Sequence, residues 1–283
     1  MARIVVTGGM GFIGSHLVEA LKKLGHKVYI FDLNYKPDPI DLTSYTDTKR
    51  HLEELTDHKT KPIDVLFDLA TLPLPRSLVE PYNIVYKIYC MGTVICELAR
   101  EGYFKTLIHI SSSEVYDITT PYAAAKDAQD KLIEAYVNCF GIDARIVRPF
   151  NTYGEGQDLG ALIPNTIKRI LKGQQPIIYG DGDNLRDYVY VSDTVNGIVS
   201  VWKKGKKGDN LDITQECCYS NKEIVEKILE LMRCSKQPKY LPKRIGDTLT
   251  IHGENTVPYE PKISLEEGLQ RTIKWWKKQN FTL

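Results

Sequence analysis

The chain has 283 residues, of which 42% are hydrophobic and 26% are charged, and its formal net charge at pH 7 is +1. These values are typical of a globular protein that can bury a sizeable core. The small net charge gives no electrostatic case for binding nucleic acid or a membrane surface, and no apolar run of about 18 residues predicts a membrane span. The six cysteines are scattered without a C-x-x-C pair, which favours reduced thiols in a cytoplasmic protein and excludes a metal site of that type.

The first predicted elements form a nucleotide-binding unit. Residues 3–7 predict a strand and not a signal peptide. The motif G-x-x-G-x-x-G follows, carried by Gly8, Gly11 and Gly14, and then a helix to about residue 24. Such glycines permit a tight turn and close approach to a pyrophosphate, and the helix N-terminus offers free N–H groups to the anion. A second strand, 27–31, ends at Asp32, whose carboxylate can accept hydrogen bonds from both adenosine ribose hydroxyls and repels a 2′-phosphate, so the unit predicts NAD.

Strands and helices continue to alternate up to residue 150. Asp41 and Leu42 are expected to begin the segment under the adenine, and a strand over 63–70 ends where a cofactor would pass, at Leu69, Ala70 and Thr71. Further strands are expected at 106–110 and 144–150, with a helix before each of them. This order predicts an α/β fold of the Rossmann type, a doubly wound parallel sheet.

The helix expected over about 82–101 is apolar on nearly every side. A helix of this kind is buried on more than one side. Packing in the core accounts for one part of that surface. We expect the remainder to pack against the same helix of a second subunit in a homodimer.

A cluster of polar residues follows the 106–110 strand and points to catalysis. Ser111, Ser112, Ser113 and Glu114 end this strand, and Tyr122 and Lys126 lie at i and i+4 on one face of the next helix. The ammonium is expected to stabilise a phenolate and so to lower the pKa of Tyr122. With Ser112 on the same reacting oxygen, these groups can move a sugar hydroxyl proton while a hydride passes to a nicotinamide.

A second Tyr-x-x-x-Lys pair, Tyr45 and Lys49, has neither a strand nor a serine cluster before it. We interpret this pair as a coincidence of spacing.

The pattern changes after about residue 153. Helices are expected at 162–171, 192–202, 220–232 and 265–278, and short strands between them. The predicted division is an NAD-binding domain of residues 1–153, to which 187–213 returns, and a smaller C-terminal α/β substrate-binding domain of 154–186 and 214–283. Asp187 and Asp193 are expected to be local caps.

Several ordered motifs resemble the extended short-chain dehydrogenase/reductase family, specifically its nucleotide-sugar epimerases, dehydratases and decarboxylases. The similarity runs almost end to end. The motifs that carry it are Thr7 to Gly14, Ser111 to Tyr116, Tyr122 with Lys126, Arg148 to Gly154, Gly180 to Val191, and Arg244 with Gly246 and Asp247.

The resemblance implies a bound NAD and a nucleotide-diphosphate sugar as substrate. The implied catalytic residues are Tyr122, Lys126, Ser112 and Glu114, with Tyr122 taking the O4 proton as C4 is oxidised. The implied cofactor residues are Gly8, Gly11, Phe12, Ile13, Gly14, Asp32, Asp41, Leu42, Leu69, Ala70, Thr71, Ser111, Tyr122, Lys126 and Pro149. The implied substrate residues are Ser112, Ser113, Asn151, Arg186 and Arg244, in which the two guanidinium groups pair with the phosphates.

The chain departs from the family pattern at a few positions. Only residues 117–121 separate the serine strand from Tyr122, so less chain is expected to cover the sugar. Asp117, Asp68 and Tyr89 stand where a glycine, a histidine and an asparagine are usual.

The reaction is expected to be 4-epimerisation of a nucleotide sugar. Because Ser112-Ser113-Glu114 also looks like the sequence of decarboxylases and dehydratases, UDP-glucuronate decarboxylation or 4,6-dehydration of a sugar nucleotide are the alternatives. A non-catalytic NAD-binding regulatory protein is the alternative of another class.

Overall fold

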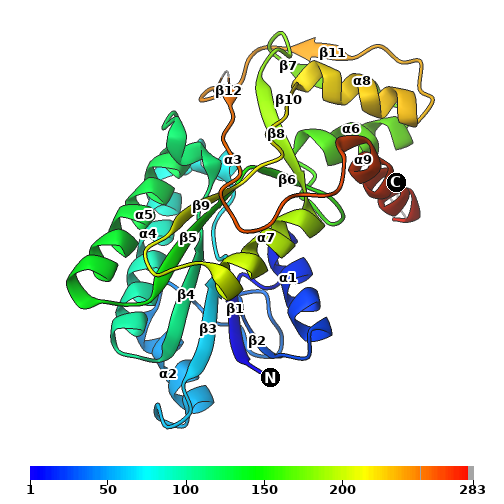
Figure 1. Cartoon of the computed structure of the whole chain (residues 1–283). Helices are drawn as coiled ribbons and strands as arrows, with labels where there is room; N and C mark the ends of the chain where they lie inside the picture. Colours follow the sequence, from blue (N-terminus) through cyan, green and yellow to red (C-terminus); the bar gives the residue numbers. More distant parts are fainter. Residues whose placement is uncertain (249, 280–283) are drawn as a thin grey trace.

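The computed structural model describes residues 1–248 and 250–279, and within them the central feature is a six-stranded parallel sheet. Its strand order is β2-β1-β3-β4-β5-β9, with helices on both faces (Figure 1). The strands are β1 (Arg3–Thr7), β2 (Lys27–Phe31), β3 (Ile63–Asp68), β4 (Phe104–Ile110), β5 (Ala144–Pro149) and β9 (Asn210–Ile213). The predicted doubly wound parallel sheet is confirmed.

Side chains that alternate along each strand bury both faces of the sheet. On β3, Leu66 faces one hydrophobic cluster, whereas Val65 and Phe67 face the other. Sheets of this kind are covered by helices on both sides because neither face can meet water. The first face is covered by α2 (Tyr45–Thr56), α4 (Pro81–Arg100) and α5 (Pro121–Phe140), and the second by α1 (Phe12–Lys23) and α7 (Val191–Lys204).

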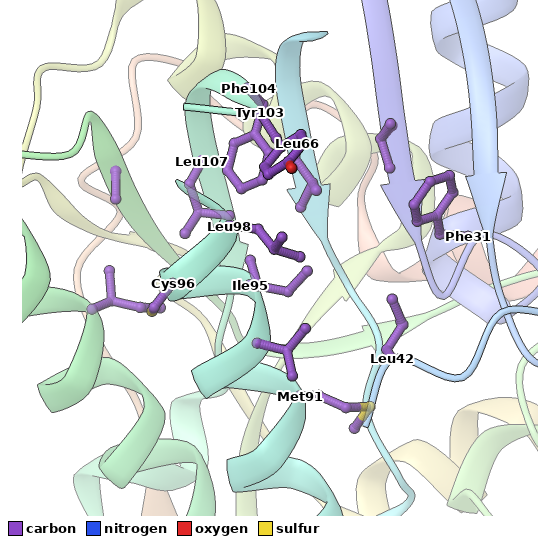
Figure 2. Packing of buried hydrophobic residues seen from close by; sticks show 14 of the residues in the cluster. Phe31, Leu42, Leu66, Met91, Ile95, Cys96, Leu98, Tyr103, Phe104 and Leu107 are labelled. Atoms are coloured by element: carbon purple, nitrogen blue, oxygen red, sulfur yellow. The ribbon is translucent and has the colours of Figure 1, made fainter. Parts of the chain in front are cut away.

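Figure 2 shows how α4 packs on the sheet. Met91, Ile95 and Leu98 project from the helix toward strand residues such as Leu66 and Leu107. The opposite side of the helix is exposed and aromatic, with Tyr82 85%, Tyr86 58% and Tyr89 43% exposed. The chain itself therefore covers one side of α4 and leaves a tyrosine-rich side uncovered.

The C-terminal part builds a second, smaller unit. Its four-stranded sheet has the order β10-β8-β12, with β6 paired to β8. The strands are β6 (Asn151–Tyr153), β8 (Leu185–Tyr190), β10 (Cys218–Ser220) and β12 (Thr250–Ile251), and β7 (Ile177–Tyr179) pairs separately with β11 (Lys239–Leu241). The helices are α6 (Leu162–Leu171), α8 (Asn221–Leu231) and α9 (Leu265–Lys278), which pack around the tyrosines of β6 and β8.

The chain returns to the main sheet later than residue 187. α7 covers the second face of the main sheet and β9 pairs with β5, whereas β8 belongs to the second sheet. The division into two domains stays a prediction. In the structure, the segment that returns to the main sheet begins with α7.

The prediction that Asp187 and Asp193 are local caps is wrong. Asp187 accepts hydrogen bonds from the backbone N–H of Gln215 (2.8 Å) and Cys217 (3.2 Å). Asp193, in the first turn of α7, accepts from the backbone N–H groups of Lys262 (2.9 Å) and Ile263 (2.7 Å) and from the Tyr259 hydroxyl (2.8 Å). Each carboxylate ties together segments that are distant in the sequence.

Two further predictions concern the state of the cysteines and the lack of a membrane-spanning segment. The six cysteines carry free thiols. Over residues 1–248 and 250–279, no helix has both the length and the apolar character needed to cross a membrane.

We expect Asp193→Asn to destabilise the protein although the two side chains have the same shape. Asp193 is 1% exposed and both of its oxygens accept hydrogen bonds, so an amide must place an N–H group against either the two backbone N–H groups or the Tyr259 hydroxyl. Leaving such buried donors unsatisfied costs about 1–3 kcal/mol, which urea unfolding can measure. Glu226→Gln on the exposed face of α8 is the control, and equal stability of the two variants would contradict this role.

Candidate active site

The carboxyl ends of the central strands open into a cavity of about 830 Å³. Its wall brings together the glycine loop after β1, the ends of β2, β3 and β4, and the start of α5. The predicted residues that line it are Gly8, Gly11, Phe12, Ile13, Gly14, Asp32, Asp41, Leu42, Leu69, Ala70, Thr71, Ser111, Ser112, Ser113, Glu114, Tyr122, Pro149 and Asn151. The roles of these residues stay predictions, although the fold gathers them around one space.

The glycine loop is packed too tightly for side chains. A Cβ on Gly14 would lie 2.1 Å from the Gly8 carbonyl oxygen, and Gly8 itself has φ +63°. The first turn of α1 begins at Phe12 with Gly11 as its N-cap and without a side-chain cap. Its N–H groups are therefore available to an anion beside the loop.

Asp32, at the end of β2, lines the cavity beside the glycine loop. Its carboxylate accepts hydrogen bonds from the backbone N–H of Met10 (3.0 Å) and Asn34 (2.8 Å). A carboxylate has about four acceptor positions, so further hydroxyl donors can still bind. Together with the glycine loop, this arrangement fits a dinucleotide whose ribose hydroxyls reach Asp32.

Two buried polar atoms in the wall have no hydrogen-bond partner among residues 1–248 and 250–279. These are the Ser111 hydroxyl and the Asn151 Nδ2 amide. Buried polar groups are normally hydrogen-bonded, so both atoms point to a polar ligand in the cavity.

Tyr122 is in the wall, but its electrostatic setting differs from the expectation. Burial raises the pKa of Tyr122 to about 12; Glu114 and Asp130 add to this, while hydrogen bonds with Thr71 and Ser112 oppose it. The prediction that Lys126 lowers this pKa is wrong for the protein without ligands. Tyr122 and Ser112 share the cavity wall, and the action of Ser112 on the reacting oxygen stays a prediction.

The position of Lys126 explains the difference. Its ammonium donates to His109 Nε2 (3.2 Å), the Ile110 carbonyl (3.0 Å) and Gln129 Oε1 (2.8 Å). These contacts hold the group behind the cavity wall, where burial lowers the pKa of Lys126 and Asp68 and Asp130 oppose that shift. Its contact with a nicotinamide ribose stays a prediction.

Glu114 lies in a 3-10 turn (Ser113–Tyr116) that connects β4 to the short loop before α5. Burial raises the pKa of Glu114, and the nearby Arg186 partly offsets this. A carboxyl group of this kind holds a proton at a higher pH than an exposed glutamate.

The two predicted phosphate ligands are engaged elsewhere. Arg186 donates to the Thr248 carbonyl (2.9 Å) and lies 3.7 Å from Asp247. The Arg244 guanidinium lies over the ring of Tyr179, 3.9 Å from its centre. Neither arginine is among the described side chains that line the cavity, so their contacts with phosphate remain predictions.

The short loop 117–121 contacts the second unit, although residues 117–119 are exposed. The Thr119 hydroxyl donates to the carbonyl of Gly246 (2.9 Å), and a Cβ on Gly246 would lie 2.8 Å from Thr120 Cγ2. The turn before β12 therefore lies against the end of this loop.

Some lining residues carry no sequence signal of their own. Met10, Ile110 and Phe150 are neighbours of recognised motifs and could have been found from them. Lys87, on α4, and Asp158, after β6, come from elements without a motif.

The Tyr45–Lys49 pair has a structural role. Lys49 donates to the Tyr45 hydroxyl (3.0 Å) and to Glu101 (2.9 Å), and Tyr45 also donates to Glu101. The pair pins α2 to the end of α4, outside the cavity wall.

Comparisons with known proteins agree with this geometry. Residues 4–214 match the model of the NAD dependent epimerase/dehydratase family, and the chain belongs to that family. It is 30% identical to a UDP-N-acetyl-alpha-D-glucosaminuronate decarboxylase of Bacillus cytotoxicus, over 97% of this chain and 98% of the relative. It is 28% identical to a dTDP-glucose 4,6-dehydratase of Haemophilus influenzae, over 98% of each.

The solved structures extend this likeness to the whole fold. The UDP-glucose 4-epimerase of Thermotoga maritima, solved with UDP-glucose, is 26% identical with a TM-score of 0.89, over 98% of this chain and 99% of that one. The dTDP-glucose 4,6-dehydratase of Streptomyces venezuelae, solved with NAD, is 25% identical with a TM-score of 0.89, over 97% of both. NAD is the cofactor of this family, and the cavity described above fits it.

We expect the protein to prefer NAD clearly to NADP. A 2′-phosphate beside the Asp32 carboxylate would place like charges together in a wall that is largely buried. Calorimetric titration with both dinucleotides measures the preference. Equal affinities would contradict the role of Asp32.

Proposed function

We propose that this member of the NAD-dependent epimerase/dehydratase family is a nucleotide-sugar 4-epimerase that oxidises C4 of its sugar transiently. The observation that supports this most is Tyr122, which shares the cavity wall with the glycine loop and with Ser112. Epimerisation asks for an acid–base group at O4 and a hydride acceptor at C4, and it needs no further acid at C6. Of the candidate reactions, it therefore needs the fewest catalytic groups in the cavity wall.

Tyr122 and Ser112 have separate roles in this reaction. Tyr122 takes the proton of the O4 hydroxyl and later returns it, and Ser112 orients the same oxygen. When bound, NAD supplies the hydride acceptor and a positively charged ring. Because the pKa of Tyr122 is about 12 in the protein alone, the bound complex must lower it for a phenolate to form.

Glu114 favours a second candidate of the lyase class. A 4,6-dehydratase needs a base for the C5 proton of a 4-keto sugar, and a decarboxylase places a carboxyl-binding group nearby. Glu114 lines the cavity with a raised pKa, and relatives of both types are similar to this chain. The epimerase stays the first proposal because Tyr122 and a bound NAD suffice for it, without a chemical role for Glu114.

One product survey distinguishes these reactions. The purified protein is incubated with UDP-, GDP-, dTDP- and CDP-sugars and with the corresponding uronates, and the products are identified by NMR. Inversion at C4 with C6 retained supports the epimerase, a 6-deoxy-4-keto sugar supports the dehydratase, and loss of CO2 supports the decarboxylase. Tightly bound NAD with no product from any of these substrates would favour the non-catalytic regulatory protein.

Cellular location is also a proposal. Six free cysteines are typical of a reducing compartment, so we propose a cytoplasmic location. Localisation of the tagged protein by microscopy tests this.

We expect Tyr122→Phe to lower turnover by about 10²–10⁴-fold, the usual contribution of general acid–base catalysis. NAD affinity and stability should change little, because the ring and its packing remain. Tyr116→Phe and Tyr45→Phe are matched controls, since these hydroxyls bind Asp212 and Glu101 respectively. If Tyr116→Phe abolishes activity while Tyr122→Phe retains it, the catalytic tyrosine is misassigned.

We also propose that α4 and α5 pack against their symmetry mates in a homodimer. Tyr82 and Tyr86 stack on the exposed side of α4 with ring centres 6.3 Å apart. The double variant Tyr82→Glu/Tyr86→Glu should then be monomeric in light scattering at micromolar concentration, whereas Tyr240→Glu on β11, which is 49% exposed, should remain dimeric. A monomeric wild-type protein would contradict the proposal.

A further inference from the structure

A chain of buried polar groups runs beneath the cavity and ends at Lys126, the lysine that the sequence predicts to be catalytic. It contains Asp68 at the end of β3, His109 on β4 and Lys126 on α5. These side chains are 2%, 0% and 1% exposed. Charged groups this deep in a core need specific partners, so the identity of those partners defines what the chain can do.

The hydrogen bonds of Asp68 fix the orientation of the chain. One carboxylate oxygen accepts from the Thr7 hydroxyl (2.7 Å), whose own oxygen already accepts from the backbone N–H groups of Leu69 (3.0 Å) and Ala70 (3.1 Å). The other lies 2.8 Å from His109 Nδ1. An ionised carboxylate only accepts, so Nδ1 carries the proton and Nε2 presents its lone pair to Lys126.

Lys126 uses each of its three N–H bonds within the protein. His109 Nε2, the Ile110 carbonyl and Gln129 Oε1 are the acceptors, and Gln129 is itself oriented by donating to the Ile88 carbonyl (2.7 Å). Removing the His109 acceptor would leave one ammonium N–H unpaired in the core. The ammonium would then be free to turn away from its present position.

The charges around His109 balance only while its ring is neutral. Asp130 pairs with Arg148 (3.0 Å), and its free oxygen lies 3.8 Å from His109 Nε2, beyond hydrogen-bond distance. The titratable and charged groups that face the ring from the surrounding elements are Asp68 of β3, Lys126 and Asp130 of α5, Arg148 of β5 and Cys96 of α4. Burial raises the pKa of the Cys96 thiol to about 12, so it is neutral, and the remaining charges sum to zero.

Protonation of His109 would break this arrangement. It would place a second positive charge 3.2 Å from the Lys126 ammonium and remove the lone pair that receives its N–H. Burial and the neighbouring Lys126 lower the pKa of His109, which keeps the ring neutral in the normal pH range.

We propose that Asp68 and His109 are positioning residues for Lys126, with His109 Nε2 as the acceptor that holds the ammonium behind Tyr122. The inference rests on the proposed function, together with the expectation from the sequence that Lys126 supports the phenolate of Tyr122 once NAD is bound. Thr7 and Asp68 also connect this chain directly to Gly8 and Leu69 in the cofactor wall. The position of the ammonium is therefore coupled to the loop that holds the dinucleotide.

Two substitutions separate positioning from simple packing. His109→Phe keeps an aromatic ring and removes the acceptor, whereas His109→Gln keeps an acceptor and a donor without a titrating ring. Ile108→Val, a buried neighbour on the opposite face of β4, is the control for loss of core packing. The probes are NAD and UDP-glucose.

We expect His109→Phe to lower turnover of UDP-glucose by about 10²-fold, the cost of misplacing a catalytic group, and to weaken NAD binding in calorimetry by about tenfold through loss of a charged hydrogen bond. His109→Gln should retain most of both. Wild-type turnover should fall on the acid side, below the ordinary histidine pKa of about 6.5, as the ring takes up a proton. The glutamine variant should lose this part of the pH profile.

A measurement on the wild-type protein decides the matter if the variants do not fold. In ¹⁵N NMR spectra of labelled histidine at pH 7, His109 should be the neutral tautomer with the proton on Nδ1. A proton on Nε2, an unchanged acid limb in His109→Gln, or equal NAD affinity in wild type and His109→Phe would each overturn the proposal. The NMR and NAD measurements stand even if no sugar nucleotide is turned over, so they separate this inference from the proposed function.

Discussion

The buried ammonium of Lys126 constrains the centre of the molecule, because the surrounding elements must supply its hydrogen-bond acceptors. A cation that is 1% exposed is stable only if acceptors surround it. β4 supplies His109 and the Ile110 carbonyl, and α5 supplies Gln129. Gln129 in turn binds the Ile88 carbonyl on α4, so the two helices and the strand are locked in one register.

The same constraint explains a glycine in the middle of α4. A Cβ on Gly92 would lie 2.9 Å from both Cγ and Nε2 of Gln129. Glycine normally destabilises the interior of a helix by about 1 kcal/mol relative to alanine. Here it provides the space in which Gln129 can reach both Lys126 and Ile88. The unfavourable helix propensity of Gly92 is therefore offset by the hydrogen bonds that Gln129 makes to the buried ammonium and to α4.

Local sequence patterns, such as apolar spacing and glycine positions, predicted most of the fold and most of the residues that line the cavity. The bounds of α6 and α9 follow from their apolar spacing, and the glycine loop follows from the need for a close turn. Contacts between distant segments were not predictable in this way. The sequence places Lys126 one turn after Tyr122. It does not show that the Lys126 ammonium donates to His109 and Gln129, because neither residue belongs to a motif. Asp193 has the spacing of a cap, although its partners lie 66 to 70 residues away.

The sugar end of the cavity is built where the two units meet, and this is why the family motifs indicate the chemistry better than the substrate. Glu114 comes from the turn after β4, whereas Arg186, which offsets its pKa shift, comes from β8 of the second sheet. Arg186 is held by the Thr248 carbonyl next to the same turn that contacts Thr119. A substrate phosphate that draws Arg186 away would remove a positive charge from Glu114 and so raise its pKa further. In the predicted substrate complex, the protonation of Glu114 would therefore be linked to the position of Arg186, a contact that the nucleotide-binding motifs do not encode.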